Sequence, residues 1–191
     1  MMAALRIGFA LTGSFCTFAR VIQEVQKLTD AGHEVTPILS FAARDTDTRF
    51  GKAEDFSRQL EEITGRTPIT TLTEAEPIGP KGLFDVLVVA PCTGSTLGRL
   101  ANGISETPVT LAVKSHLRRN RPVVLAVSTN DALVASLRNI AYLKNAKNIY
   151  FVPLSQDDPV SKPNSLVADF TRIDDTITAA LAGTQIQPLF L

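Results

Sequence analysis

The sequence predicts a doubly wound α/β fold, in which helices cover both faces of a mainly parallel sheet. The 191 residues are 45% hydrophobic and 20% charged, which is typical of a globular protein. Short apolar runs that suit buried parallel strands alternate with amphipathic segments that suit helices. Such alternation indicates successive β-α units around one sheet. No linker interrupts it, so we expect residues 1–191 to form a single domain.

The expected strands are apolar runs bounded by Gly, Pro, Ser or Thr. Four of them are continuous, as in strands buried on both faces, whereas the run at 34–41 alternates in part and the run at 69–72 is weaker. In chain order the six runs are Leu5–Leu11, Glu34–Phe41, Ile69–Leu72, Phe84–Ala90, Pro122–Val127 and Ile149–Leu154.

The expected helices carry apolar residues three and four positions apart. Gly32 and Gly65 are placed to end the first two, Ser95-Thr96 to cap the third, and Thr107-Pro108 to begin the fourth. The periodic segments are Phe18–Leu28, Phe56–Ile63, Leu97–Ile104, Pro108–Arg119, Leu133–Leu143 and Asp174–Ala182. Strands and helices in this order are typical of a sheet of the Rossmann or flavodoxin type.

Charge and residue usage exclude several classes of function. Lys and Arg total 19 and Asp and Glu total 19, so no net charge draws the chain to nucleic acid or to an acidic membrane. The run after Arg6 is too short for a membrane span and has Gly8 within it, so we interpret it as the first strand rather than a signal peptide. Two cysteines and two histidines without metal-ligand spacing predict no metal site. A reduced, cytoplasmic protein is the expectation.

Four strand ends are rich in small and hydroxyl-bearing residues. In an open α/β sheet, ligands bind beyond the carboxyl ends of the strands. Small residues let backbone N–H groups approach a phosphate, and a helix N-terminus favours negative charge. Any one such turn is more often a plain helix cap, but four together favour a phosphate cradle. The candidate cofactor-binding residues are Gly13, Ser14, Ser40, Phe41, Pro91, Cys92, Thr93, Gly94, Ser95, Thr96, Ser128, Thr129 and Asn130.

The identity of the phosphate ligand follows from what these turns contain. Neither the Gly-x-Gly-x-x-Gly spacing of dinucleotide sites nor a Gly-Lys-Ser/Thr triphosphate loop is present. A dinucleotide fold also needs an acid after the second strand, where Ser40 and Phe41 stand instead. A hydroxyl beside an aromatic ring suits a mononucleotide phosphate and a flat ring, which favours FMN over NAD.

These turns resemble the flavoprotein family of FMN-binding cysteine decarboxylases. Gly13-Ser14 takes the place of the family's first loop, and Pro-Cys-Thr-Gly-Ser-Thr at 91–96 is similar in outline to its Pro-Ala-Ser-Ala-Asn-Thr loop. Leu-Ala-Asn-Gly-Ile at 100–104 follows that loop, and Ala-Val-Ser-Thr-Asn at 126–130 takes the place of its Pro-x-Met-Asn segment. The resemblance implies bound FMN and a homo-oligomer, a trimer or larger, with the flavin between subunits.

A second set of segments resembles one branch of that family over about Arg6 to Pro188. The segments are 11–14, 48–51, 75–81, 120–125, 128–133 and, most specifically, Gln-Asp-Asp-Pro-x-x-Lys-Pro-Asn-Ser at 156–165. This resemblance implies one subunit of a two-component oxidoreductase in the mother-cell cytoplasm of a spore-forming bacterium. It implies a dihydropyridine dicarboxylate as substrate and NADP on the partner subunit.

Arg49, Lys162 and Asn164 are the substrate-side candidates for such a dianion. Arg binds a carboxylate in two-pronged fashion and Lys adds a point charge. Asp157-Asp158 before Pro159 is interpreted as a turn. Residues 185–191 are apolar and dock either on a neighbouring molecule or on the chain's own sheet edge.

The chain also departs from the decarboxylases. Pro77–Pro80 stands where they carry a catalytic histidine, and Ser95 stands where their loop has asparagine. Without an imidazole near the flavin, no base is evident for the thiol oxidation that precedes decarboxylation. We therefore assign no catalytic residue. An FMN-dependent decarboxylase and a non-enzymatic assembly subunit with a vestigial flavin pocket stay as alternatives.

His33, His116 and the two cysteines are predicted to be structural. His33 precedes the second strand, far from the carboxyl ends, and His116 lies in a helix among Lys114, Arg118 and Arg119, where a solvated face is expected. Cys16 and Cys92 are interpreted as small buried apolar residues rather than a redox pair.

Overall fold

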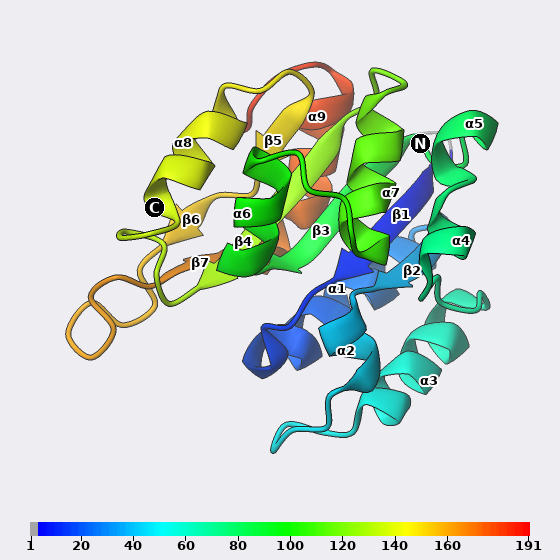
Figure 1. Ribbon diagram of the computed structural model, residues 1–191, viewed down its shortest axis with the longest axis horizontal. Helices are drawn as coiled ribbons and strands as arrows, with labels where there is room; N and C mark the ends of the chain where they lie inside the picture. Colours follow the sequence, from blue (N-terminus) through cyan, green and yellow to red (C-terminus); the bar gives the residue numbers. More distant parts are fainter. Residues whose placement is uncertain (1–3) are drawn as a thin grey trace.

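The computed structural model describes residues 4–191, in which seven strands form one mixed sheet with the order β2-β1-β3-β4-β7-β6, while β5 also pairs with β4. The strands β2, β1, β3, β4 and β5 are parallel, whereas β7 is antiparallel to β4 and β6 to β7. This arrangement confirms the predicted mainly parallel α/β fold (Figure 1). The strands are β1 Arg6–Leu11, β2 Glu34–Leu39, β3 Val86–Cys92, β4 Val123–Thr129, β5 Ile149–Phe151, β6 Leu154–Ser155 and β7 Leu166–Ala168.

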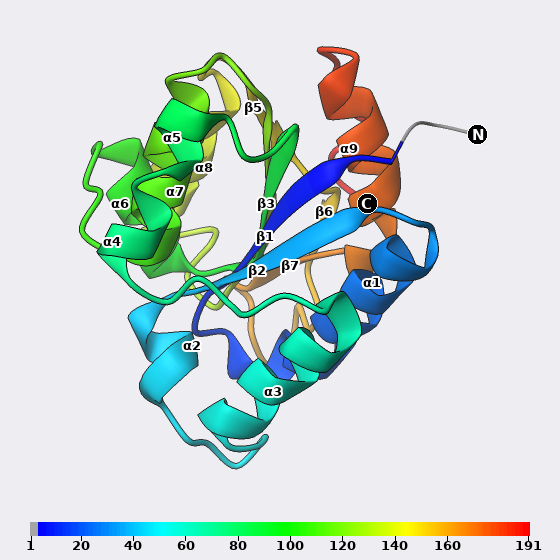
Figure 2. The ribbon, with the colours of Figure 1, turned by 90° about the vertical axis from the view of Figure 1, so that its right-hand side faces the viewer.

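Helices cover both faces of the sheet. Figure 2 shows α1, α3 and α9 on one side and α4 to α8 on the other. None of the helices within residues 4–191 is long and apolar enough to span a bilayer. The α-helices are α1 Phe18–Asp30, α2 Phe41–Asp45, α3 Ala53–Thr64, α4 Leu72–Ala75, α5 Ile78–Lys81, α6 Gly94–Ala101, α7 Pro108–Leu117, α8 Leu137–Lys144 and α9 Ile173–Leu181, and the 3-10 helices are η1 Phe15–Thr17 and η2 Phe170–Arg172.

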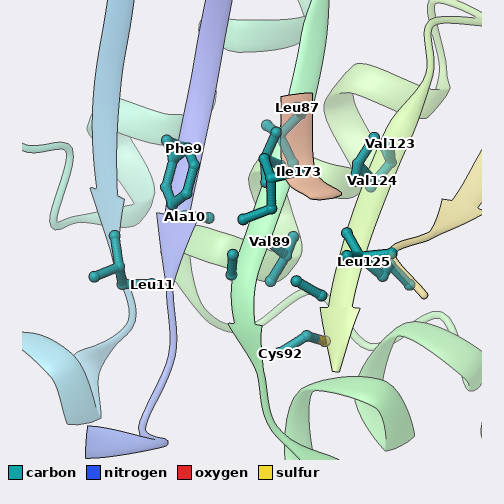
Figure 3. Packing of buried hydrophobic residues seen from close by; sticks show 14 of the residues in the cluster. Phe9, Ala10, Leu11, Leu87, Val89, Cys92, Val123, Val124, Leu125 and Ile173 are labelled. Atoms are coloured by element: carbon teal, nitrogen blue, oxygen red, sulfur yellow. The ribbon is translucent and has the colours of Figure 1, made fainter. Parts of the chain in front are cut away.

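The core lies on the central strands β1, β3 and β4. Every residue of β3 is buried, which is why its sequence is a continuous apolar run rather than an alternating one. Phe9, Val89 and Leu125 are fully buried, and Ile173 of α9 packs into the same cluster (Figure 3). Burial of each such side chain contributes about 1.5–3 kcal/mol. The rigid central strands thereby fix the loops that follow their carboxyl ends.

Four expected elements differ in the structure, and the start of α6 is described with the site below. Ile69–Leu72 is not a strand: Ile69 makes one bridge to Ile38, and Thr71 with Glu74 forms a capping box that begins α4 at Leu72. The run 149–154 is divided, since β5 ends at Phe151 and β6 begins at Leu154.

The third difference is the start of α8, at Leu137 rather than Leu133. The Ser136 amide donates to the Asp131 carbonyl at 3.1 Å and holds residues 131–136 in turns. By contrast, the structure confirms that Gly65 ends α3 and that Thr107-Pro108 begins α7.

Residues 189–191 lie along the outer edge of β6. The Leu154 amide donates to the Leu189 carbonyl at 2.8 Å, and the Leu191 amide donates to the Leu154 carbonyl at 2.9 Å. Leu154 and Phe190 form a parallel bridge. Of the two alternatives for this apolar segment, the structure therefore shows docking on the chain's own sheet.

Candidate functional site

Two adjoining hollows lie beyond the carboxyl ends of the central strands, where the strand order reverses between β1 and β3. The larger hollow, of about 740 Å³, is lined by the segments that follow β1, β3 and β4. The smaller hollow, of about 340 Å³, is lined by the segments that follow β2, β1 and β3. Both hollows share Gly13, Phe15, Thr93 and Ser95, which form the wall between them.

The structure divides the predicted cofactor residues between these hollows instead of gathering them in one cradle. Pro91 and Cys92 line neither hollow, because β3 continues to Cys92 and buries both side chains. The predicted cofactor residues that line only the larger hollow are Ser14, Gly94, Ser128, Thr129 and Asn130. Those that line only the smaller hollow are Ser40, Phe41 and Thr96. Ser14, Ser40 and Thr96 therefore share one end of the sheet but no common cavity.

Ser14 and Ser128 join the ends of β1 and β4 in the larger hollow. Their hydroxyl oxygens lie 2.8 Å apart, although β3 separates the two strands. Ser14 makes no capping hydrogen bond through its side chain, so its hydroxyl is directed to this contact. Ser14 is thus positioned by the tertiary fold rather than by a helix start.

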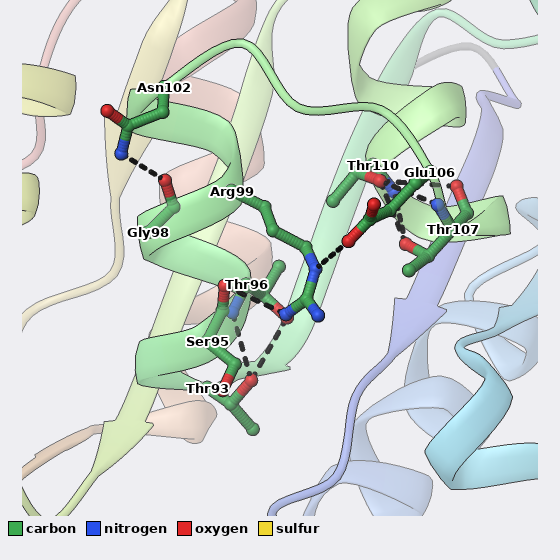
Figure 4. Close-up of polar contacts among 9 residues, drawn as sticks. All are labelled: Thr93, Ser95, Thr96, Gly98, Arg99, Asn102, Glu106, Thr107 and Thr110. Carbon is green, nitrogen blue, oxygen red and sulfur yellow. Dashed lines mark hydrogen bonds and ion pairs between the residues drawn. The ribbon is translucent and has the colours of Figure 1, made fainter.

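A chain of threonine hydroxyls crosses from β1 to α6. The Thr12 hydroxyl donates to the Pro91 carbonyl at 2.7 Å and accepts the Thr93 amide at 3.1 Å. Thr93 caps α6: its Oγ1 accepts the Thr96 amide at 3.3 Å and lies 3.0 Å from the Thr96 Oγ1 (Figure 4). The predicted Ser95-Thr96 cap is therefore wrong by two residues. Ser40 likewise caps α2 by accepting the Ala43 amide at 3.2 Å.

Gly94 lets an acidic residue approach the start of α6. A Cβ atom at Gly94 would lie 2.6 Å from the Asp131 Oδ1 and 2.8 Å from the Ser136 Oγ. The same carboxylate oxygen accepts the Thr129 hydroxyl at 2.6 Å and the Ser136 hydroxyl at 2.9 Å. Asp131 lines the larger hollow, and sequence reasoning did not identify it as a site residue.

The larger hollow contains most of the charge of the site. Arg49 and Lys162, the substrate-side candidates, line it, together with Arg20 and Asp157, which were not predicted as site residues. The Lys162 Nζ lies 3.1 Å from the Asp157 Oδ2, and this hydrogen-bonded carboxylate raises the pKa of Lys162. Asn164 does not line the hollow; its carbonyl accepts the Leu133 amide at 3.0 Å.

Neither histidine lines the two hollows. The His116 Nε2 lies 3.1 Å from the Pro122 carbonyl, and burial lowers the pKa of His116 to about 4. This side chain is buried, so the expected solvated position is wrong. The His33 Nδ1 accepts the Leu5 amide at 3.2 Å, in keeping with a structural role.

The two cysteines occupy different environments. Cys92 is buried, and burial raises the pKa of its thiol, whereas Cys16 is exposed on the larger hollow, contrary to expectation. Both are free thiols. Among the described residues no cluster of three or more His, Cys, Asp or Glu side chains is arranged to hold a metal ion.

Comparisons with known proteins agree with this architecture. The family model described as Flavoprotein matches residues 1–184. The dipicolinate synthase subunit designated B, from Bacillus subtilis (strain 168), is 44% identical over 186 residues, which are 97% of this chain and 93% of that protein. The crystal structure of the same dipicolinate synthase subunit from Bacillus halodurans C matches with a TM-score of 0.91 and 41% identity, covering 100% of this chain and 98% of that one. The crystal structure of the FMN-dependent cysteine decarboxylase SpaF matches with a TM-score of 0.70 and 21% identity over 95% and 98% of the two chains, a likeness that shows the fold.

Proposed function

The chain belongs to the flavoprotein family, and from this membership we propose that it acts as the dipicolinate synthase subunit designated B. With the subunit designated A as its NADP-binding partner, it oxidises dihydrodipicolinate to dipicolinate during sporulation. The substrate loses a hydride to NADP and a proton to the medium, so the products are dipicolinate, NADPH and a proton. The observation that carries the proposal is the 44% identity to the Bacillus subtilis protein over 97% of the chain.

Arg49 in the larger hollow supports a dicarboxylate substrate. Arg49 lines the hollow, and a guanidinium can bind a carboxylate through two parallel hydrogen bonds. Lys162, with Asp157 beside it, completes the proposed substrate side, whereas Asn164 lies outside the hollow and is not assigned to it. Because no residue of this chain is assigned as the proton acceptor, the roles of these side chains are binding and orientation.

The smaller hollow fits the phosphate of an FMN-type cofactor. The Ser40 hydroxyl accepts the Ala43 amide, and its own proton has no acceptor within residues 4–191. Thr96 lies on the same wall. Phe41 is 37% exposed, and although the Arg44 guanidinium lies over its ring, the exposed part can contact a flat heterocycle. A bound flavin would supply a hydride carrier next to the substrate hollow, which takes two electrons from the substrate and returns them to NADP. Gly13, Thr93 and Ser95 would then contact both ligands.

The absence of an acid after β2 supports a division of labour between two proteins. Ser40 and Phe41 stand where a dinucleotide fold carries the residue that binds the ribose hydroxyls. We accordingly place NADP on the partner. We also propose that residues 1–191 form a single flavoprotein domain. This domain assembles as a trimer or larger homo-oligomer in the mother-cell cytoplasm. Light scattering after size-exclusion chromatography measures the oligomer.

The test of this function is reconstitution with the partner protein. NADPH should form when the purified chain is mixed with its NADP-binding partner, NADP and freshly generated dihydrodipicolinate. The NADPH absorbance measures the rate. Either protein by itself should form no NADPH. Full activity of the partner by itself would contradict a catalytic role and favour an assembly subunit. Release of carbon dioxide from a peptide with a C-terminal cysteine would instead favour the decarboxylase alternative, against which the absence of histidine from both hollows argues.

A further inference from the structure

Two arginines that line the larger hollow each lie over an aromatic ring and form no ion pair within residues 4–191. The Arg20 guanidinium carbon, on α1, lies 5.0 Å from the centre of the Phe170 ring. The Arg49 guanidinium carbon, in the loop between α2 and α3, lies 4.9 Å from the centre of the Phe50 ring. Stacking on a ring holds a guanidinium in place while its N–H groups stay available at the edge.

Neither of these guanidinium groups is paired with a carboxylate within residues 4–191. Arg44 provides the contrast, because it also stacks on a ring, that of Phe41, but lies 2.6 Å from the Asp45 carboxylate. The carboxylates of the larger hollow are themselves engaged. Asp157 pairs with Lys162, and Asp131 accepts the Thr129 and Ser136 hydroxyls. The N–H groups of Arg20 and Arg49 are therefore available for an anion from solution.

We infer that Arg20 and Arg49 form a two-arginine clamp, in which each guanidinium binds one carboxylate of a small dicarboxylate. This inference rests on the proposed function and adds Arg20, from a separate element, as a specificity-determining residue. The planar guanidinium matches a carboxylate in two-pronged fashion, so two such groups select a ligand with two carboxylates over one with a single carboxylate. Lys162, already neutralised by Asp157, contributes less to this selection.

Calorimetric titration of the full chain tests the clamp. The probes are pyridine-2,6-dicarboxylate and, as the matched monoanion, pyridine-2-carboxylate. The wild-type chain should prefer the dicarboxylate by at least about tenfold. Arg20→Gln should weaken dicarboxylate binding by about 10- to 100-fold, the usual range for a lost charged hydrogen-bonded pair, and remove the preference. Arg138→Gln, an exposed arginine of α8 outside the hollow, should leave both affinities unchanged.

Unchanged dicarboxylate binding in Arg20→Gln would overturn the inference. The inference would also be overturned if Arg20→Gln lost affinity for FMN or inorganic phosphate but kept its affinity for the dicarboxylate, because Arg20 would then bind a phosphate group. If circular dichroism shows that Arg20→Gln is unfolded, Arg20→Lys takes its place, because lysine keeps the positive charge but lacks the planar guanidinium. Arg20→Lys should bind the dicarboxylate about tenfold more weakly than the wild type. Equal affinity of Arg20→Lys and the wild type would also refute the clamp. Failure of the reconstitution assay, by contrast, would refute the proposed function, while the titration would still measure whether Arg20 and Arg49 bind a dicarboxylate.

Discussion

The Ser14 and Ser128 hydroxyl oxygens lie 2.8 Å apart and connect the ends of β1 and β4 across β3. Ser128 is buried, so its hydroxyl depends on this partner. The contact joins the first loop to the end of β4 within the lining of the larger hollow. This dependence can be measured by removing each hydroxyl separately and then both together.

Ser14→Ala and Ser128→Ala should be non-additive in their effect on the free energy of unfolding. Loss of the Ser14 hydroxyl leaves a buried hydroxyl without its partner, which costs about 1–3 kcal/mol, whereas the double variant has no unpaired group. Urea denaturation of the wild type, the two single variants and the double variant measures the coupling. Strictly additive losses would show that the two hydroxyls do not interact.

Gly94→Ala should destabilise the protein by about 1–3 kcal/mol. The new methyl group would overlap the Asp131 carboxylate and the Ser136 hydroxyl, and α6 would have to shift. Gly98→Ala in the same helix is the control: its Cβ would have only the Asn139 amide nitrogen within 4 Å, at 3.7 Å, and alanine favours helix, so stability should be unchanged or raised by up to about 1 kcal/mol. Equal melting temperatures for the two variants would contradict this account.

His116 should make the protein less stable in acid. Burial lowers the pKa of the folded-state imidazole to about 4, below its unfolded value of about 6.5. The unfolded chain therefore binds a proton that the folded chain does not, and the stability present above pH 6.5 is lost progressively towards pH 4, by up to about 3 kcal/mol. His116→Gln should flatten the pH dependence of urea denaturation over this window. An NMR titration that gives a folded pKa near 6.5 would refute the assignment.

Ser40→Ala should weaken FMN binding by about tenfold, because it removes the hydroxyl proposed to donate to the phosphate. It also removes the cap of α2, at a cost of about 1 kcal/mol in stability. Thr71→Ala removes a comparable cap, that of α4, away from both hollows, and should leave FMN affinity unchanged. Flavin absorbance titration measures both variants; equal losses of affinity would point to a general stability effect.

Much of the sheet could be predicted because β1, β3 and β4 are buried on both faces and their sequences are correspondingly apolar. The strands β6 and β7 could not, since segments of two and three residues carry no periodicity, and β7 pairs with β4, which is distant in sequence. The helix over 133–143 was predicted too long because Leu133 fits the apolar spacing although a turn contains it.

The lining of the two hollows was predictable where residues follow strand ends, and it was not predictable where residues are brought together only by tertiary packing. Ser14, Thr93 and Ser128 follow strands, so the carboxyl-end rule located them. Arg20 occupies an ordinary helix position, and Asp131 gains its setting from Gly94 and Ser136, which no local pattern reveals. The division into two hollows also arises from packing, since Phe15 and Ser95 separate cavities that a linear sequence presents as one set of turns.

The pairing of Leu189 and Leu191 with Leu154 has a counterpart at the opposite side of the sheet, where the Leu39 amide donates to the Ile69 carbonyl at 2.8 Å and the Ile69 amide to the Pro37 carbonyl at 2.9 Å. The side-chain amide of Gln185 likewise bonds both the Phe151 N–H, at 2.9 Å, and the Phe151 carbonyl, at 2.6 Å. These contacts occupy backbone groups at the sheet edges that would otherwise be open to a strand of another molecule, which disfavours strand exchange and amyloid-like growth there. Quaternary contacts are then expected to form through helices and loops.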